Sequence, residues 1–349
     1  MAGSSKPDEQ HEGRRSVKIP DLFSSIMAPK PVVNPNYSKV KAEGDEWIAR
    51  IMKMDEKTSA KNKRADLCYL CSLWAPDADA ESLRVMLDWC HWVFVFDDQF
   101  DEGHLKDDPV AAQEEINENM AIMDENAQLI DPWENPIRYV FQVCWLWLKQ
   151  RATPELQQRY KEQHKEYFDQ IVAQVQQAAK EELLSRDVQT YLEVRRGTIG
   201  VYPIIPLAQY SQGIELPESI FSNRSLQEII RLSAEITFMT NDILSYRRDL
   251  ELGVDHNLIP LLEKQGMSVQ QSIDKIGAMI SDRCKRWYTT LAELPSYGEN
   301  VDREVLLFVE LCRNIALGNL HWSFKTCRYF DSEEESNDIH QSRIIHLSS

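Results

Sequence analysis

The sequence predicts an all-α protein, a single helical bundle around a central apolar cavity. Apolar residues recur three and four positions apart through most of the chain, whereas the alternation typical of β-strands is scarce. Hydrophobic residues make up 43% of the 349 positions, which is enough for a large core. No Gly/Ser-rich linker or internal repeat divides the middle of the chain. A helical chain of this length must surround some helices with others, and such a bundle can enclose a ligand.

Pro, Gly and Asp/Asn clusters separate the helical segments. Ser225 and Glu228 have the spacing of a capping box, and Asp187 is placed to cap another helix. Polar residues dominate 1–17 and 331–338, which predicts disorder there. The expected organisation is therefore a tail over 1–17, one domain over 18–330 and a polar tail over 331–349. Helices are expected over 78–101, 135–150, 154–182, 187–196, 226–251, 268–292 and 303–327.

Charge and composition exclude several classes of protein. The net charge of -17 argues against non-specific binding to nucleic acid or to an anionic membrane. No stretch reaches the roughly 18 to 20 apolar residues that span a bilayer, and the N-terminus lacks the apolar run of a signal peptide. The seven cysteines have no second CxxC pair to complete a zinc site, which favours free thiols. We therefore expect a cytoplasmic protein, and an anionic substrate would need metal ions or arginines to bind.

An acidic cluster follows the most apolar helix. The run 89–96 leads directly into Asp97, Asp98 and Asp101, whose carboxylates are three or four positions apart and share one helix face. Carboxylates at the negative end of a buried helix dipole are unfavourable without a cation. Magnesium, which prefers oxygen ligands, is the natural candidate. A solvated acidic helix end is the alternative interpretation.

A second polar stripe lies on the helix over 226–251. Asn241, Ser245 and Asp249 recur four positions apart, so successive members drift by only about 40° around the axis. Three oxygen-bearing side chains in one line are able to hold a second metal ion, and Arg248 on the same turn is placed to reach a phosphate. An exposed polar helix face is the alternative here.

Together these residues resemble the class I terpene synthases, in particular fungal sesquiterpene cyclases. The segment 97–102 is similar to their aspartate-rich motif, and 241–249 is similar to their Asn/Ser/Glu magnesium motif. Arg195 resembles the arginine that senses diphosphate in that family, and Arg328-Tyr329 resembles the C-terminal Arg-Tyr pair. One departure is that Asp249 stands where the family usually has Glu. Glu251 is the alternative ligand, although it points about 200° further round the helix than Asp249.

The resemblance implies three Mg2+ ions that clamp a diphosphate. It assigns two ions to Asp97, with help from Asp101, and one ion to Asn241, Ser245 and Asp249. It also implies that diphosphate binding is coupled to closure at a helix break at Thr198 and Ile199. The implied donors to the phosphate oxygens are Arg195, Arg248, Arg328 and Tyr329, and the candidate residues lining the apolar pocket are Phe94, Trp322, Phe238 and Tyr69.

The implied reaction is the Mg-dependent ionisation and cyclisation of farnesyl diphosphate. The run from Asn241 to His256 looks most like mushroom-type cyclases, which suggests delta-6-protoilludene formed through a 1,11-closed humulyl cation. Ring closure between carbons 1 and 10, of the germacrene or cadinene type, is the alternative route. A chain-elongating prenyltransferase would carry a second DDxxD motif, which the chain lacks, and a non-catalytic prenyl-binding protein would need none of these residues. Monomer and homodimer are equally compatible with the sequence.

Overall fold

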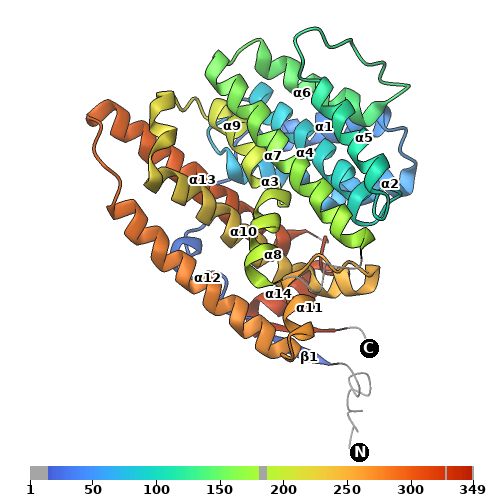
Figure 1. Cartoon of the computed structure of the whole chain (residues 1–349), viewed down its shortest axis with the longest axis vertical. Coiled ribbons are helices and arrows are strands. Elements are labelled where there is room, and N and C mark those ends of the chain that lie inside the picture. Colours follow the sequence, from blue (N-terminus) through green and yellow to red (C-terminus); the bar gives the residue numbers. More distant parts are fainter. Residues whose placement is uncertain (1–14, 181–186, 327, 348–349) are drawn as a thin grey trace, which may run out of the picture.

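The computed structural model describes residues 15–180, 187–326 and 328–347. The fold is all-α, as predicted, and its long helices pack in layers (Figure 1). The helices are α1 (Tyr37–Ile51), α2 (Glu56–Ala65), α3 (Leu67–Trp74), α4 (Ala80–Asp101), α5 (Pro109–Ala121), α6 (Pro136–Lys149), α7 (Pro154–Ala179), α8 (Val188–Thr198), α9 (Val201–Ser211), α10 (Arg224–Leu252), α11 (Leu258–Lys264), α12 (Val269–Ala292), α13 (Glu299–Lys325) and α14 (Glu333–Ser342). Two 3-10 helices, η1 (Ser25–Met27) and η2 (Glu218–Ser222), and the strands β1 (Ser16–Lys18) and β2 (Ile344–His346) complete the described part.

Side-chain caps set the starts of several helices. Asp187 caps α8, as predicted, because its carboxylate accepts a hydrogen bond from the backbone N–H of Thr190. The predicted capping box at Ser225 and Glu228 is wrong. Asn223 caps α10 instead and accepts from two backbone N–H groups, at 2.9 and 3.2 Å. The helix therefore begins two residues earlier than expected.

Three long helices organise the packing. Helix α10 packs against α12 and α13, α4 packs against α1, α3 and α6, and α7 packs against α5, α8 and α9. In Figure 1, α10 and α8 lie in the middle of the molecule with α12 on one side and the α4–α7 layer on the other. No helix in the described ranges is long and apolar enough to cross a membrane.

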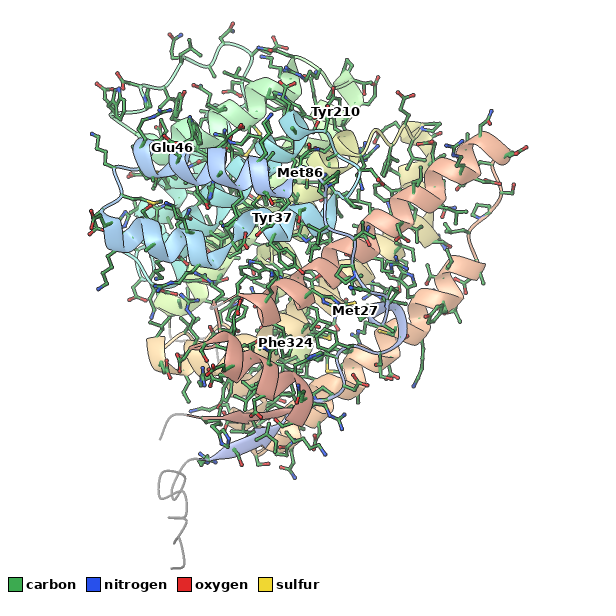
Figure 2. All side chains as sticks on the ribbon, turned by 180° about the vertical axis from the view of Figure 1, so that it is seen from behind. Met27, Tyr37, Glu46, Met86, Tyr210 and Phe324 are labelled. Carbon is green, nitrogen blue, oxygen red and sulfur yellow. The ribbon has the colours of Figure 1, made fainter. Side chains whose placement is uncertain are left out.

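The predicted disorder at the C-terminal end is wrong for residues 333–338, which belong to α14. The chain continues from α14 into β2, which pairs antiparallel with β1, so that Val17 lies opposite Ile345. The N-terminal segment crosses the back of α13 on its way from β1 (Figure 2). The ring of Phe23 in this segment packs against those of Phe324 and His340, with centroids 5.2 and 4.3 Å away. Tertiary contacts with the other end of the chain therefore order a segment whose own composition is polar. The predicted disorder over 1–17 is also wrong at Ser16 and Val17, which belong to β1, and residues 1–14 of that predicted tail lie outside the described residues.

The remaining helices were not expected from the sequence, for identifiable reasons. Helix α2 has no buried residue and thus no apolar stripe. Helix α9 contains Pro206 in its interior, which argues against a helix on sequence grounds, yet all but two of its residues are buried. Its apolar surroundings outweigh the backbone hydrogen bond that proline removes.

Candidate active site

The predicted metal-binding residues meet at one cavity in the middle of the bundle. The cavity has an empty volume of about 1040 Å³, counted with its open mouth. The acidic end of α4 and the polar stripe of α10 face this common space, as the sequence predicted. The predicted site residues that line it are Phe94, Asp97, Asp101, Arg195, Thr198, Ile199, Asn241, Ser245, Arg248, Asp249, Arg328 and Tyr329.

Two half-buried carboxylates lie one turn apart at the end of α4. Asp97 Oδ1 accepts a hydrogen bond from Tyr167 (2.9 Å), and Asp101 Oδ1 accepts one from Gln174 (2.7 Å). Burial raises the pKa of Asp97 well above its usual range, and the charge of Asp101 raises it further. Burial also raises the pKa of Asp101 to about 6. A cation between such carboxylates relieves both effects, so this end of α4 is suited to a divalent metal ion.

The polar stripe of α10 presents neutral oxygens beside one carboxylate. Ser245 Oγ donates to Asp249 Oδ2 at 2.6 Å, and Asn257 Nδ2 donates to the same oxygen at 2.9 Å. Burial raises the pKa of Asp249 despite these two donors. Glu251 is exposed and does not line the cavity. The position of Asp249, with the support of Asn257, therefore favours it over Glu251 as a ligand.

Arg195 joins α8 to the polar stripe. Its guanidinium donates to Asn241 Oδ1 at 2.9 Å and to Asp242 Oδ1 at 3.1 Å. Burial alone would lower the pKa of Arg195, but the charges of Asp242, Asp101 and Asp249 outweigh burial and raise it. The guanidinium therefore stays charged and lies within the electrostatic reach of both acidic clusters.

Two further arginines lie at the cavity. Arg248 forms an ion pair with Glu102 at 2.6 Å, which connects the end of α10 with the end of α4. Arg328 lies 3.5 Å from Asp98, and its guanidinium carbon is 5.2 Å from the centroid of the Phe94 ring. The Nε of Arg328 is buried and has no hydrogen-bond partner. These donors are placed to neutralise an anionic group at the cavity.

The donor set fits a hard cation that is held partly by its substrate. Among residues 15–180, 187–326 and 328–347, no three His, Cys, Asp or Glu side chains form a ready-made metal site. The lining residues instead offer separate carboxylate, amide and hydroxyl oxygens. Mg2+ characteristically binds through one or two carboxylates together with waters and substrate phosphates. An incomplete oxygen set of this kind is therefore compatible with Mg2+ and incompatible with a structural zinc site.

Comparisons with known proteins agree with this geometry. Residues 88–286, more than half of the chain, match the family described as Terpene synthase family 2, C-terminal metal binding. The chain belongs to the terpene synthase family. The synthase is 42% identical to the (+)-eremophilene synthase of Gibberella fujikuroi, across 95% of this chain and 93% of that protein. It is 40% identical to the (1R,4R,5S)-(-)-guaia-6,10(14)-diene synthase of Fusarium proliferatum, across 97% and 88% of the two chains.

Solved structures share the fold of this synthase. The crystal structure of a-eudesmol synthase superimposes with a TM-score of 0.75 at 22% identity and covers 84% of this chain and 96% of its own. Family membership confirms the predicted class I fungal cyclase. The protein is therefore an enzyme of the terpene cyclase type, a carbon–oxygen lyase of prenyl diphosphates.

The break between α8 and α9 lies between Arg195 and the next part of the cavity wall. Thr198 and Ile199 line the cavity just after Arg195. Gly200 has a φ of 78°, in the left-handed region that favours glycine. A Cβ at Gly197 would come within 2.2 Å of the Gln170 side chain, so α8 and α7 are in close contact here. The arginine and the break therefore form one tightly packed unit.

Of the predicted aromatic lining residues, only Phe94 lies at the cavity. Trp322 is fully buried behind it, with its ring centroid 5.6 Å from that of Phe94, and its indole N–H donates to the carbonyl of Ala65 at 2.7 Å. Phe238 packs toward Tyr191 in the core, with centroids 6.3 Å apart. These two residues support the wall and do not form its surface.

Tyr69 also lies away from the cavity surface. Its ring packs against Tyr37, with centroids 6.0 Å apart, and the ammonium of Lys325 lies 5.0 Å from its centroid. The neighbouring Leu70 lines the cavity instead. A one-residue step turns a helical side chain by about 100°, which accounts for the exchange.

Several lining residues were missed in the sequence. Trp89 and Val93 precede Asp97 at steps of four on α4, so they share its stripe. This spacing in the sequence could have predicted that both residues line the cavity. Thr237 likewise precedes Asn241 by four residues on α10 and shares its stripe. Lining residues elsewhere in the chain had no local signal that could have identified them: Trp74, Tyr167, Val201, Ile204, Val254, His256, Ile315 and Asn319.

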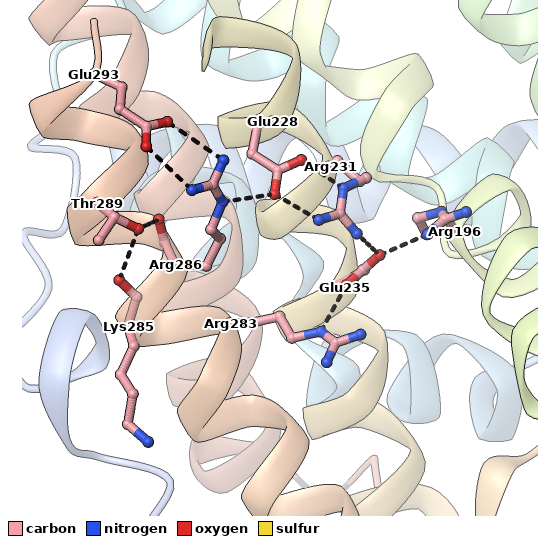
Figure 3. Close-up of polar contacts among 9 residues, drawn as sticks. All are labelled: Arg196, Glu228, Arg231, Glu235, Arg283, Lys285, Arg286, Thr289 and Glu293. Carbon is pink, nitrogen blue, oxygen red and sulfur yellow. Dashed lines mark hydrogen bonds and ion pairs between the residues drawn. The ribbon is translucent and has the colours of Figure 1, made fainter. Parts of the chain in front are cut away.

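A buried acid joins three helices behind the site (Figure 3). The side chain of Glu235 on α10 is 0% exposed and pairs with Arg196 on α8 (2.6 Å), Arg231 on α10 and Arg283 on α12 (2.8 Å). Arg196 directly follows Arg195 in the sequence. Glu235 therefore fixes the part of α8 that carries Arg195, which lines the cavity.

Proposed function

We propose that this terpene synthase is a sesquiterpene synthase, which ionises farnesyl diphosphate in the presence of Mg2+ and cyclises the resulting cation. The observation that carries the proposal is the single cavity that has acidic and cationic groups at one end and apolar walls elsewhere. Relatives at 42% and 40% identity are named for single hydrocarbon products. A relative from Cyclocybe aegerita, at 26% identity, is named a sesquiterpene synthase.

The polar end of the cavity is assigned to the diphosphate. Arg195, Arg248, Arg328 and Tyr329 would donate hydrogen bonds to phosphate oxygens in exchange for their present partners. Charge-assisted bonds of this kind are most valuable where negative charge develops on the leaving group. These four residues therefore favour the departure of the diphosphate more than the binding of the intact substrate.

The metal ligands proposed are those that line the same end. Asp97 and Asp101 would hold ions at α4, and Asn241, Ser245 and Asp249 would hold one at α10. Three Mg2+ ions are the expected number. When bound, they would supply positive charge that neutralises the diphosphate. The contribution of the chain is to orient these oxygens, which Tyr167, Gln174 and Asn257 do by hydrogen bonding to the three carboxylates.

The apolar part of the cavity is assigned to the prenyl chain. Phe94, Trp74 and Trp89 present aromatic rings at the wall, where ring faces stabilise a cation. The indole N–H groups of both tryptophans are already engaged, with the carbonyl of Ile315 (3.2 Å) and with His164 (3.0 Å). The wall therefore excludes water from the cation without leaving these donors unpaired.

The product proposal is delta-6-protoilludene by 1,11-closure, with 1,10-closure as the alternative. The relatives from Gibberella fujikuroi and Fusarium proliferatum are named for other hydrocarbons, (+)-eremophilene and a guaiadiene. Product choice depends on the contour of the apolar wall, because that contour decides which carbons of the prenyl cation meet. Gas chromatography with mass spectrometry of the hydrocarbon, against authentic standards, decides between the two closures.

Incubation of the purified full-length chain with farnesyl diphosphate and Mg2+ tests the proposed function. We expect release of diphosphate and a cyclic hydrocarbon, loss of both with EDTA, and recovery with excess Mg2+. Asp97→Ala and Asn241→Ala are expected to reduce turnover at least about a hundredfold. Asp169→Ala, at an exposed position on α7, is the matched control and should keep full turnover.

Other outcomes point to other functions. A longer prenyl diphosphate would identify a chain-elongating transferase, and unaltered substrate under all metal conditions would refute catalysis on farnesyl diphosphate. Full turnover by either site variant would show that the corresponding metal site is wrongly assigned. The cytoplasmic location and the oligomeric state, monomer or homodimer, stay predictions from the sequence.

A further inference from the structure

One uncharged polar residue of the cavity wall differs from the others. Among the described residues, Asn319 on α13 lines the cavity, is 9% exposed, and has a buried side-chain amide oxygen with no hydrogen-bond partner. The other uncharged polar side chains of the wall are engaged: Thr198 with His256, Thr237 with the Ser233 carbonyl, Ser245 with Asp249, Tyr167 with Asp97, and Asn241 with Arg195 and Tyr329.

The residues beside Asn319 on α13 are apolar. Ile315, one turn earlier on the same face of α13, also lines the cavity, and its carbonyl is taken by the indole of Trp74. Gly318, beside Asn319, lies against Trp74, because a Cβ there would come within 2.8 Å of the indole. Asn319 therefore places an amide in a wall that is otherwise aliphatic and aromatic at this point.

An unpaired buried amide oxygen lowers the stability of a fold, and an aliphatic side chain of similar size would avoid that cost. The two ends of the amide exchange places by a half-turn about χ2, so the carbonyl oxygen is able to face the cavity. A carbonyl dipole in a dry cavity interacts strongly with positive charge, because no water screens it. The interaction of the amide oxygen with a cation in the cavity would therefore offset the cost of burying it.

We propose that Asn319 is a specificity-determining residue, whose amide oxygen stabilises positive charge on the prenyl skeleton at the α13 wall. This inference rests on the proposed function. By lowering the energy of the cations whose charge lies beside α13, the amide favours the products that derive from them. Its effect is expected on product ratio more than on total turnover, since ionisation takes place at the diphosphate end.

The test compares Asn319→Leu and Asn319→Ala with the wild-type enzyme on farnesyl diphosphate and Mg2+. Leu keeps the approximate volume and removes the polar group, whereas Ala removes both. Asn314→Leu is the matched control, since Asn314 lies on the same helix, is equally buried at 9% and does not line the cavity. The readouts are the product ratio by gas chromatography, the total rate of diphosphate release and the thermal midpoint.

We expect both Asn319 variants to lower the ratio of the main product to the next at least tenfold, which corresponds to about 1.4 kcal/mol. Total turnover should fall less than tenfold. The thermal midpoint of the Leu variant should equal or exceed that of the wild type, whereas the Asn314 control should keep the wild-type ratio.

Two results would overturn the inference while the proposed function stands. One is a product ratio within twofold of wild type in both Asn319 variants. The other is a change in the Ala variant alone, which would assign the effect to volume. A wild-type enzyme that consumes no farnesyl diphosphate would refute the proposed function, and this inference with it.

Discussion

Removal of the Glu235 carboxylate should be among the most destabilising single changes in the protein. Glu235 is fully buried, and its two oxygens accept from Arg196, Arg231 and Arg283. Burial alone would raise its pKa, but the hydrogen bonds from Arg283 and Arg196 outweigh burial and hold the pKa below its usual range. In Glu235→Ala the guanidinium groups of Arg196, Arg231 and Arg283 would lose their shared carboxylate, although Arg231 would keep its pair with Glu228.

The size of the expected loss of stability follows from how exposed the three arginines are. Breaking a buried ion pair by removing one member costs about 3–5 kcal/mol. The side chains of Arg196, Arg231 and Arg283 are 17%, 36% and 23% exposed, so water partly screens the charges that remain. We therefore expect a loss near the lower limit, about 3 kcal/mol.

The matched control for this prediction is Glu228→Ala. Glu228 belongs to the outer part of the same network (Figure 3), where it pairs with Arg231 and Arg286 and its side chain is 20% exposed. Pairs at this level of exposure contribute about 0–1 kcal/mol. Unfolding in urea, followed by circular dichroism, measures both variants. Two results would contradict this reasoning. One is an equal loss of unfolding free energy in the two variants, and the other is a loss below about 1 kcal/mol for Glu235→Ala.

Three further predictions concern the surroundings of the site. Tyr167→Phe removes the hydrogen bond to Asp97, so the Mg2+ concentration for half-maximal turnover should rise about tenfold; an unchanged value would show that the bond does not support the ligand. Burial lowers the pKa of His164 from 6.5 to about 3, so protonation favours the unfolded chain below pH 6.5. Stability should therefore fall by about 2 kcal/mol between pH 7 and pH 5, and a His164→Phe variant should lack this component of the pH dependence in urea midpoints. Gly200→Ala forces a Cβ onto a φ of 78°, so the free energy of unfolding measured in urea should fall by about 1 kcal/mol and turnover should fall as well. Gly213→Ala, at a φ of 65° with no atom within 4 Å, should lose the same stability and keep its turnover.

Local spacing accounts for what could be predicted of the site. Asp97 and Asp101 on one helix, and Asn241, Ser245 and Asp249 on another, were correctly expected to face a common cavity. A fixed step of about 100° per residue places such groups on one face, whatever the helix packs against. The same rule applied to Trp89 and Val93 would have extended the α4 stripe into the cavity wall.

The aromatic wall could not be predicted in this way. Trp322, Phe238 and Tyr69 were expected at the cavity and lie in the core, while Trp74 was not expected and lines it. Which face of a helix meets the cavity depends on the rotation of that helix against its neighbours. That rotation is settled by packing between residues far apart in the chain.

The sequence by itself determined the fold class, the family and the polar end of the active site, because helical periodicity and motif spacing act over a few neighbouring residues. Tertiary structure alone decided the rest. It ordered the acidic C-terminal segment as α14 and β2, enclosed Glu235 among arginines of three helices, and left the Asn319 amide oxygen unpaired beside an apolar wall. Each of these features depends on partners brought together only by folding, because the stability of a buried polar group is set by the groups around it.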